Sequence, residues 1–173
     1  LEMGDVWLRA RKDDAVEVRF GGQVHEWVDE NGKFRASQTD YHAVTAVPHD
    51  MFISGYGSQA VNKLTLWSAC LPQSFDMAAF SRGDYVRALE QNTMAETISK
   101  VLYPADDHIE GKRLRLRQQY LLVSASLQSI LKAHLKQYHT LKNLADKVAI
   151  HINDTHPALC VPELMRLLVD EYE

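Results

Sequence analysis

The stretch VAIHINDTHP, residues 148–157, decides the predicted fold class. Its first half, 148–152, is a compact apolar run of the length and β-branched character typical of a buried strand. The polar residues that follow, ending at Pro157, predict a turn. Helical patterns flank this stretch, at 112–135 and at 162–172. Helix, apolar strand, polar turn and helix in succession favour an α/β fold with a doubly wound sheet.

Residues 1–70 predict a mainly antiparallel β region. Apolar and polar residues alternate there in short segments, as they do in half-buried strands. The pairs Gly21-Gly22 and Asn31-Gly32 suit the positive φ angles of tight hairpin turns. Pro48 is expected to end a strand. The predicted strands span 16–20, 23–28, 43–47 and 63–67.

Two further helical patterns follow, separated by a loop. Residues 84–102 contain neither proline nor glycine and carry only a thin apolar stripe, so this helix should project into solvent or pack on a partner. The loop is expected to span Tyr103–Gly111, because Pro104 stops the helix and Gly111 marks the end of the loop. The predicted helix at 112–135 places its core positions at helical spacing; they are Leu116, Tyr120, Val123, Leu127, Ile130 and Leu131.

Composition narrows the class of protein. The net charge is −4 and the basic residues are scattered, which argues against a nucleic-acid-binding face. No apolar run is long enough to predict a membrane-spanning helix. Cys70 and Cys160 form no Cys-x-x-Cys pair, so two free thiols in a reducing, cytoplasmic compartment are expected. The start at Leu1 and the end at Glu173, inside a predicted helix, favour a piece of a longer protein.

The polar turn at 153–157 is the first candidate site. It stands at the carboxyl end of the predicted strand, where open α/β sheets bind ligands. Its amide, carboxylate, hydroxyl and imidazole groups can hydrogen-bond sugar hydroxyls. An equally weighted alternative is that Asp154 or Thr155 only caps the next helix. A metal site built from His151, Asp154 and His156 is disfavoured, because no fourth ligand lies nearby in sequence.

The acidic loop at 105–112 is the second candidate site. Asp106 and Asp107 are adjacent, and neighbouring carboxylates repel each other, so composition alone favours an exposed connection. The alternative is a mobile gate over a polar pocket. In that case Arg115, one turn into the next helix, would be a partner for the loop, which also carries His108.

Six runs, in this order and spacing, resemble a known family. They are Leu66–Ala69 (LWSA), Val101–Pro104 (VLYP), Glu110–Lys112 (EGK), Leu114–Gln118 (LRLRQ), Asn153–Pro157 (NDTHP) and Pro162–Arg166 (PELMR). On these runs the chain resembles the α-glucan phosphorylases, which comprise the glycogen and maltodextrin phosphorylases. The resemblance covers nearly the whole chain and is strongest from Asn62 onward.

The resemblance implies a fold and an activity for the intact enzyme. Two Rossmann-like domains of the glycosyltransferase-B type would face a cleft, with residues 1–173 forming part of the N-terminal one. The enzyme would transfer the terminal α-1,4-glucosyl unit of a glucan to inorganic phosphate, giving glucose 1-phosphate. Pyridoxal phosphate would assist, and its attachment lysine would lie outside this chain. The chain alone is therefore expected to be inactive.

The resemblance also implies roles for individual residues. Asp154 and His156 match positions beside the glucosyl site, and Arg115 matches the back of the same pocket. Asp106, Asp107 and His108 match the gate loop, residues 103–112, between solvent and that site. Relatives often carry asparagine where Asp107 stands, so the sugar contact keeps an acceptor here and loses an amide donor.

Two further implications concern assembly and regulation. Residues 84–102 match a helix that packs against its twin in a homodimer, and its contact positions are Val86, Leu89, Met94 and Ile98. Lys132-Ala133 stand where animal relatives carry an arginine pair for AMP, so weak or absent AMP activation is expected. The alternatives are a non-catalytic glucan-binding or dimerisation module and a nucleotide-sugar glycosyltransferase. The gate and NDTHP runs together argue against the second.

Overall fold

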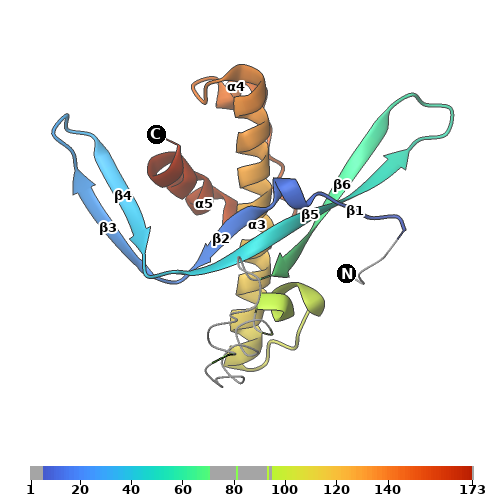
Figure 1. The fold of residues 1–173 in the computed structure, drawn as a ribbon, viewed down its shortest axis with the longest axis horizontal. Helices are drawn as coiled ribbons and strands as arrows, with labels where there is room; N and C mark the ends of the chain where they lie inside the picture. The colour runs from blue at the N-terminus through green and yellow to red at the C-terminus, as the bar shows by residue number, and fades with distance from the viewer. Residues whose placement is uncertain (1–5, 71–80, 82–92, 94, 173) are drawn as a thin grey trace. The chain divides into compact units, whose positions relative to one another are not determined.

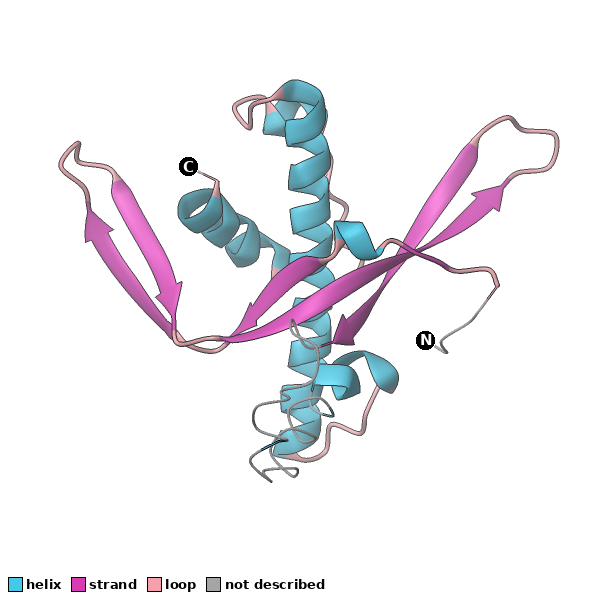
Figure 2. Ribbon diagram, in the orientation of Figure 1, coloured by secondary structure: helices cyan, strands magenta, loops and turns pink. Residues whose placement is uncertain are grey.

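The computed structural model describes residues 6–70, 81, 93 and 95–172, with strands in the first part of the chain and helices in the second (Figures 1 and 2). The chain divides into two units. The first holds the residues up to Val18 and Ala43–Gln118, and the second holds Arg19–His42 and the residues from Gln119 onward. The mixed α/β character and the antiparallel strands predicted from the sequence are confirmed.

A long strand, β5 (His42–Ser54), is the centre of a four-stranded sheet. It pairs with β1 (Arg9–Ala10), β2 (Val16–Phe20) and β6 (Val61–Cys70), and a 3-10 turn, η1 (Lys12–Asp14), joins β1 to β2. Successive side chains of a strand point to opposite faces, and alternate residues are buried accordingly. One face of β5 and β6 buries Val44, Ala46, Pro48, Trp67 and Ala69.

Pro48 does not end its strand, which corrects the prediction made from the sequence. It lies in the middle of β5, opposite Trp67 of β6, and is almost fully buried. Proline removes only its own N–H from the ladder, and its carbonyl remains available. That carbonyl accepts a hydrogen bond of 2.9 Å from the backbone N–H of Arg11. The strand therefore continues through Pro48 and reaches Ser54.

The buried face of β5 also carries one carboxylate, Asp50, which is 2% exposed. Its oxygens accept hydrogen bonds from Arg11 Nε at 2.6 Å and from the Thr65 hydroxyl at 2.8 Å. Burial raises the pKa of Asp50, but the hydrogen bonds from Arg11 and Thr65 outweigh burial and bring the pKa below its usual value. This carboxylate thus joins β5 to β6 and to Arg11, the residue that follows β1.

A separate hairpin is formed by β3 (Gln23–Val28) and β4 (Phe34–Thr39), with the turn predicted at Asn31-Gly32 (Figure 2). Gly21-Gly22 has the predicted positive φ angles, but it joins two different sheets and forms no hairpin. The backbone is crowded there, because a Cβ on Gly22 would lie 2.3 Å from the carbonyl oxygen of Thr39. Glycine is therefore required at residue 22 both by the positive φ angle and by the close approach of the Thr39 carbonyl.

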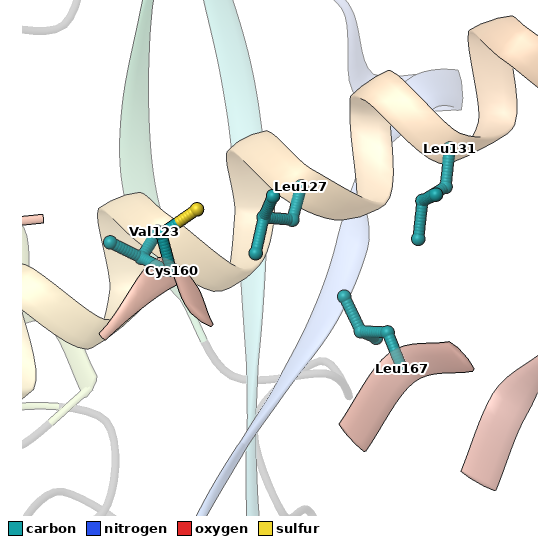
Figure 3. Close-up of a cluster of buried hydrophobic side chains, with 5 residues drawn as sticks. All are labelled: Val123, Leu127, Leu131, Cys160 and Leu167. Atoms are coloured by element: carbon teal, nitrogen blue, oxygen red, sulfur yellow. The ribbon is translucent and has the colours of Figure 1, made fainter. Parts of the chain in front are cut away.

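The second unit contains the part of helix α3 (Ile109–Tyr138) from Gln119 onward, which packs against α5 (Cys160–Arg166) and a π-helical turn, η2 (Leu167–Glu171). A short helix, α4 (Leu144–Lys147), follows α3. The buried cluster shown in Figure 3 comprises Val123, Leu127, Leu131, Cys160 and Leu167. Each such leucine contributes about 1.5–3 kcal/mol through burial.

The predicted helix at 112–135 is confirmed, and it extends further at both ends. Val123, Leu127 and Leu131 are buried as predicted, whereas Leu116 is 54% exposed, so its assignment to the core is wrong. Helical spacing identifies a face of a helix. It does not say how far along that face the neighbouring elements reach.

The strand predicted at residues 148–152 is not formed. Val148 has extended backbone angles, φ −125° and ψ 129°, but the segment pairs with no strand among the described residues. Ile150 packs partly against the core of the second unit, while Ile152 is 38% exposed. A central parallel strand requires neighbours on both sides. The apolar run alone therefore gives an extended segment and no ladder.

Only part of the predicted helix at 84–102 is described. Residues 95–100 are helical, and Ile98 is buried, with 5% of its surface exposed. The Ser99 hydroxyl accepts a 2.8 Å hydrogen bond from the Ala69 backbone N–H, which ties this helix to the end of β6. The other predicted contact positions, Val86, Leu89 and Met94, lie outside the described residues. No helix within the described ranges is long and apolar enough to span a membrane.

Candidate functional site

The turn at 153–157 places a carboxylate and an imidazole next to each other. Asp154 has a φ of +64°, a left-handed conformation that aspartate tolerates better than most residues. Its Oδ1 accepts a 2.6 Å hydrogen bond from the Thr155 backbone N–H. Its Oδ2 lies 3.5 Å from Nε2 of His156. Both side chains are exposed, at 63% for Asp154 and 46% for His156.

The sequence left two alternatives for this turn, a sugar-binding site and a cap of the following helix. Helix α5 begins at Cys160, and its N-cap residue, Leu159, makes no side-chain capping bond. Asp154 and Thr155 lie too early in the chain to cap this helix, so the capping interpretation is wrong. In addition, no group of three histidine, cysteine, aspartate or glutamate side chains in the described part of the chain could hold a metal ion.

The electrostatics of the turn keep Asp154 ionised. The hydrogen bond from the Thr155 backbone N–H lowers its pKa most, and the charge of a protonated His156 lowers the pKa further. An ionised carboxylate accepts hydrogen bonds only, and an imidazole N–H can donate one. The pair thus offers an acceptor and a donor 3.5 Å apart, which matches the hydroxyl groups of a neutral polyol.

The gate loop belongs to the first unit, and Arg115 of α3 forms an ion pair with its Asp106. Gln118, one turn later, donates a 2.7 Å hydrogen bond to the carbonyl of Val101. The loop opens with Tyr103 at a φ of +55°. Asp107 is exposed beside Asp106. Arg115 is thus paired with the loop, which fits both a gate and an exposed connection.

His108 connects the gate loop to α3. Its Nδ1 accepts a 2.8 Å hydrogen bond from the backbone N–H of Gly111, and its carbonyl accepts a 3.1 Å bond from the N–H of Lys112. Helix α3 accordingly begins at Ile109, and Gly111 lies inside its first turn rather than at the end of the loop. Glycine is needed at this position, since a Cβ on Gly111 would lie 1.7 Å from the carbonyl oxygen of Ala105.

Sequence reasoning missed a buried polar cluster in the second unit. Glu163 of α5 is 3% exposed and accepts hydrogen bonds from three side chains. The donors are the Tyr120 hydroxyl at 2.8 Å, the Ser124 hydroxyl at 2.6 Å, and Arg166 through Nε at 2.8 Å and Nη2 at 2.9 Å. Tyr120 and Ser124 lie on α3, so one carboxylate joins α5 to α3.

The surroundings of Glu163 favour its charged form. Burial raises the pKa of Glu163, but hydrogen bonds from Arg166 and Ser124 and the charge of Arg166 outweigh burial and lower it. Burial, with the charge of Glu163, raises the pKa of Tyr120 to about 12. The i,i+3 spacing of Glu163 and Arg166 is the one sequence signal that could have revealed the pair. Its partners on α3 lie about forty residues away.

The chain offers no residue suited to anchor pyridoxal phosphate. A lysine that forms a Schiff base is activated by desolvation or by a neighbouring cation. Every lysine of this chain is exposed. The described lysines thus do not fit the cofactor's attachment site.

Comparison with known proteins covers the whole chain. The profile of the carbohydrate phosphorylase family matches residues 1–173. The glycogen phosphorylase of Haemophilus influenzae is 47% identical over 99% of this chain and 20% of its own length. That of Chlamydia pneumoniae is 44% identical over 100% of the chain and 21% of its own length. The human brain form is 40% identical over 98% of the chain and 20% of its own length.

Proposed function

The chain belongs to the carbohydrate phosphorylase family, and we propose that it supplies part of the glucan-binding cleft of a glycogen or α-glucan phosphorylase. It spans about a fifth of the length of the relatives it matches. The whole enzyme would transfer the terminal α-1,4-glucosyl unit of a glucan to inorganic phosphate, giving glucose 1-phosphate. The match of the family profile to the entire chain carries this proposal.

The fold of the whole enzyme is part of the proposal. Two Rossmann-like domains of the glycosyltransferase-B type would form the cleft, with residues 1–173 in the N-terminal one. The extended segment 148–152 supports this arrangement, because it has strand-like backbone and an apolar sequence but no partner strand among the described residues. Its partners would come from other parts of the N-terminal domain, and pairing would bury residues such as Ile152, which is 38% exposed here.

Four residues would contribute to the sugar pocket. Asp154 and His156 would hydrogen-bond the glucosyl unit, an assignment supported by their exposed donor and acceptor 3.5 Å apart. Arg115 would hold the gate loop through Asp106, with which it forms an ion pair. Asp107, exposed in the same loop, would accept a hydrogen bond from a sugar hydroxyl.

The cofactor and the assembly are proposed for the whole enzyme only. Pyridoxal phosphate would supply a phosphate group that exchanges a proton with the substrate phosphate, and a lysine outside this chain would hold it. Residues 84–102 would form the homodimer contact, although Ile98 is already buried within the chain. A cytoplasmic location is supported by the two free thiols, Cys70 and Cys160.

Regulation by AMP should be weak or absent in the whole enzyme. Lys132 and Ala133 are both exposed on α3, where animal relatives are expected to present two arginines to the nucleotide phosphate. One lysine cannot reproduce two planar guanidinium forks. Phosphorolysis by the full-length protein should therefore change by less than about twofold when AMP is added at millimolar concentration. Stimulation comparable to that of an AMP-dependent relative would contradict this interpretation.

The direct test of the proposal compares the full-length protein with the 173-residue chain. Glucose 1-phosphate release from maltoheptaose and inorganic phosphate is measured for both. The full-length protein should be active and should lose activity when the pyridoxal cofactor is removed, whereas the chain alone should be inactive. Turnover by the isolated chain would refute the proposed division of the active site.

A non-catalytic glucan-binding module is the second candidate, because the chain itself exposes Asp154 and His156. Titration of the chain with maltoheptaose, followed by NMR shifts at these two residues, separates the possibilities. Saturable shifts in the chain, combined with an inactive full-length protein, would favour the binding module. Competition of a nucleotide sugar with maltoheptaose in the full-length protein would instead favour a nucleotide-sugar glycosyltransferase.

A further inference from the structure

The connection between β3 and β4 is a short turn that begins at Asp29. The last paired residues of the hairpin are Val28 and Phe34. The N–H of Gly32 donates a 2.9 Å hydrogen bond to the carbonyl of Asp29, and Gly32 has a φ of +76°. A short hairpin loop commonly contains a turn followed by a residue in the left-handed conformation, which glycine adopts without strain. Gly32 therefore follows Asn31 for a structural reason.

The sequence that suits the turn also brings two reactive groups together. Asn31 is the one asparagine of the sequence that is followed by glycine. The backbone nitrogen after an asparagine can attack the side-chain carbonyl carbon, Cγ, because this closes a five-membered ring. A side chain on the attacking residue would hinder the approach, but Gly32 has none, and the space where a Cβ would lie is open. Asn31 is exposed, and no hydrogen bond holds its side chain within the described ranges.

The turn restrains this reaction while it stays closed. The attacking nitrogen must lose its proton, and in the closed turn that proton is bonded to the Asp29 carbonyl. The carboxylate of Asp29 strengthens the closed form. Its Oδ1 accepts hydrogen bonds from the N–H groups of Asn31 at 2.9 Å and Lys33 at 3.0 Å, and its Oδ2 accepts one from Nε of Arg35 at 2.8 Å. Local opening that frees the Gly32 nitrogen therefore works against these bonds too.

We propose that Asn31 is a site of spontaneous deamidation, and that Asp29 sets the rate by holding the turn closed. The nitrogen of Gly32 gives its proton to water and bonds to Cγ of Asn31. The bond from Cγ to the side-chain nitrogen breaks, and that nitrogen takes up a proton and leaves as ammonia, so a cyclic imide remains.

Water completes the reaction by opening the ring. It adds to one of the two imide carbonyl carbons and breaks the bond from that carbon to the ring nitrogen. Addition at Cγ gives aspartate, and addition at the backbone carbonyl carbon gives isoaspartate. In sum, the asparagine and one water become an acid and ammonia, so no oxidant, reductant or enzyme is required.

Both products change the hairpin. Each adds a negative charge beside Asp29 and Glu30, and like charges on a short turn repel each other. Isoaspartate also adds one methylene group to the backbone, which displaces the Gly32 N–H from the Asp29 carbonyl. A two-stranded hairpin is only marginally stable by itself. Because β4 contacts η2, loosening of the hairpin would also affect the segment that follows α5.

Mass spectrometry of the full-length protein tests the proposed site. The protein is kept in mildly alkaline buffer at physiological temperature, and the peptide covering residues 24–35 is followed for the gain in mass that exchange of NH₂ for OH produces. Methylation by an isoaspartate-specific methyltransferase measures the second product. Both signals should rise with time at Asn31 and stay absent at Asn62, which is followed by lysine. Asn31→Gln should show neither signal, because it would have to close a six-membered ring.

Comparison of rates tests the role of Asp29. A free peptide with the sequence of residues 24–35 supplies the rate for an unrestrained Asn31, and the wild-type protein should convert more slowly. Asp29→Ala should convert about fivefold faster than the wild type, because losing even one net hydrogen bond raises the population of the open turn by about that factor. The matched control, Glu30→Ala, removes the same charge from the same turn but none of these bonds, and should change the rate by less than about twofold.

Two sets of results would overturn the proposal. If Asn31 stays unmodified in both the wild type and Asp29→Ala after the free peptide has been converted completely, it is not a deamidation site of the folded protein. If the wild type converts as fast as the free peptide, or no faster in Asp29→Ala than without that substitution, Asp29 does not hold the turn closed. None of these results depends on whether the protein is a phosphorylase.

Discussion

Replacement of Glu163 by glutamine should destabilise the chain by about 3 kcal/mol. The wild-type carboxylate is 3% exposed and accepts hydrogen bonds from Tyr120, Ser124 and Arg166. Glutamine has nearly the same shape, but one of its two acceptor atoms becomes an NH₂ group. In either orientation that group would face one hydroxyl of α3 and one nitrogen of the Arg166 guanidinium, so at least one buried donor loses its acceptor.

The magnitude follows from the surroundings of the arginine. Removing one partner of a buried ion pair generally costs about 3–5 kcal/mol, because the other charge is left uncompensated. Arg166 retains Asp170 at 3.2 Å and Glu171 at 3.6 Å, and 20% of its side chain is exposed. The cost should therefore lie at the lower end of the range. With an m value of about 2 kcal/mol/M, it corresponds to a decrease of about 1.5 M in the urea midpoint.

The assay is urea denaturation of the 173-residue chain at pH 7, followed by circular dichroism. Glu30→Gln, an exposed substitution of the same chemistry, is the control and should change stability by less than about 0.5 kcal/mol. Because the folded-state pKa of Glu163 is lowered, its contribution is present above its unfolded-state pKa and is lost as the pH falls through the folded-state value. The difference between wild type and variant should therefore shrink below about pH 4.

Two results would refute this reasoning. A midpoint for Glu163→Gln within about 0.3 M of the wild type at pH 7 would mean that the cluster contributes little net stability. A difference that persists unchanged at pH 3 would mean that ionisation of the carboxylate is not its source.

Three further predictions follow from the other sites. Leu131→Ala should lower the free energy of unfolding by about 2–5 kcal/mol, because Leu131 is fully buried. The control, Leu116→Ala, should lower it by less than about 1 kcal/mol, because Leu116 is exposed. Equal losses of stability in urea denaturation would contradict the assignment of Leu131 to the core. Gly111→Ala should lower the free energy of unfolding by about 1–3 kcal/mol despite alanine's higher helix propensity, because the added Cβ would lie 1.7 Å from a backbone oxygen. The control, Gly55→Ala, places its Cβ 3.4 Å from a side chain only and should leave stability nearly unchanged. Asp154→Asn should lower kcat/KM for maltoheptaose by about tenfold in the full-length enzyme, and the lowered pKa of Asp154 predicts no activity step from this group above about pH 4. A wild-type rate in that variant would remove Asp154 from the sugar pocket.

Local sequence patterns predicted those elements whose formation depends only on residues close to one another in the sequence. The alternation around Val18 predicted β2, and Asn31-Gly32 predicted the turn between β3 and β4, because strand period and turn chemistry are properties of short segments. The spacing of Val123, Leu127 and Leu131 predicted the buried face of α3 for the same reason. Each of these features is determined by residues within about two turns or one hairpin.

Predictions that depend on a distant partner were less successful. Gly21-Gly22 has turn geometry, yet pairing placed β2 beside β5 rather than beside β3. The segment 148–152 is extended but unpaired, because a strand is defined by its neighbours and not by its own composition. Pro48 was expected to end a strand, yet it loses only one donor, and its carbonyl still accepts a bond from Arg11.

The candidate sites follow the same division. Residue type made Asp154, His156 and the acidic loop candidates, and the bonds that hold the turn lie within three residues of one another; their binding roles stay predictions. The bond between the ring of His108 and the Gly111 N–H could not be predicted, because histidine is not among the usual capping residues. Glu163 could not be predicted as buried, since an isolated glutamate on a helix is normally exposed. Only Arg166 one turn later and two hydroxyls of α3 make its burial possible.

The position of the turn at 153–157 depends in part on this buried pair. The chain between residue 153 and α5 has few attachments of its own: the Cys160 N–H bonds the Pro157 carbonyl at 2.9 Å, and the Ala158 N–H bonds the Thr155 carbonyl at 3.0 Å. Helix α5 spans only Cys160–Arg166, and an isolated helix of that length is not stable in water. Its position is set by the packing of Cys160 and by the bonds of Glu163 to α3. The bonds of Glu163 to α3, together with this packing, therefore fix where Asp154 and His156 lie relative to that helix.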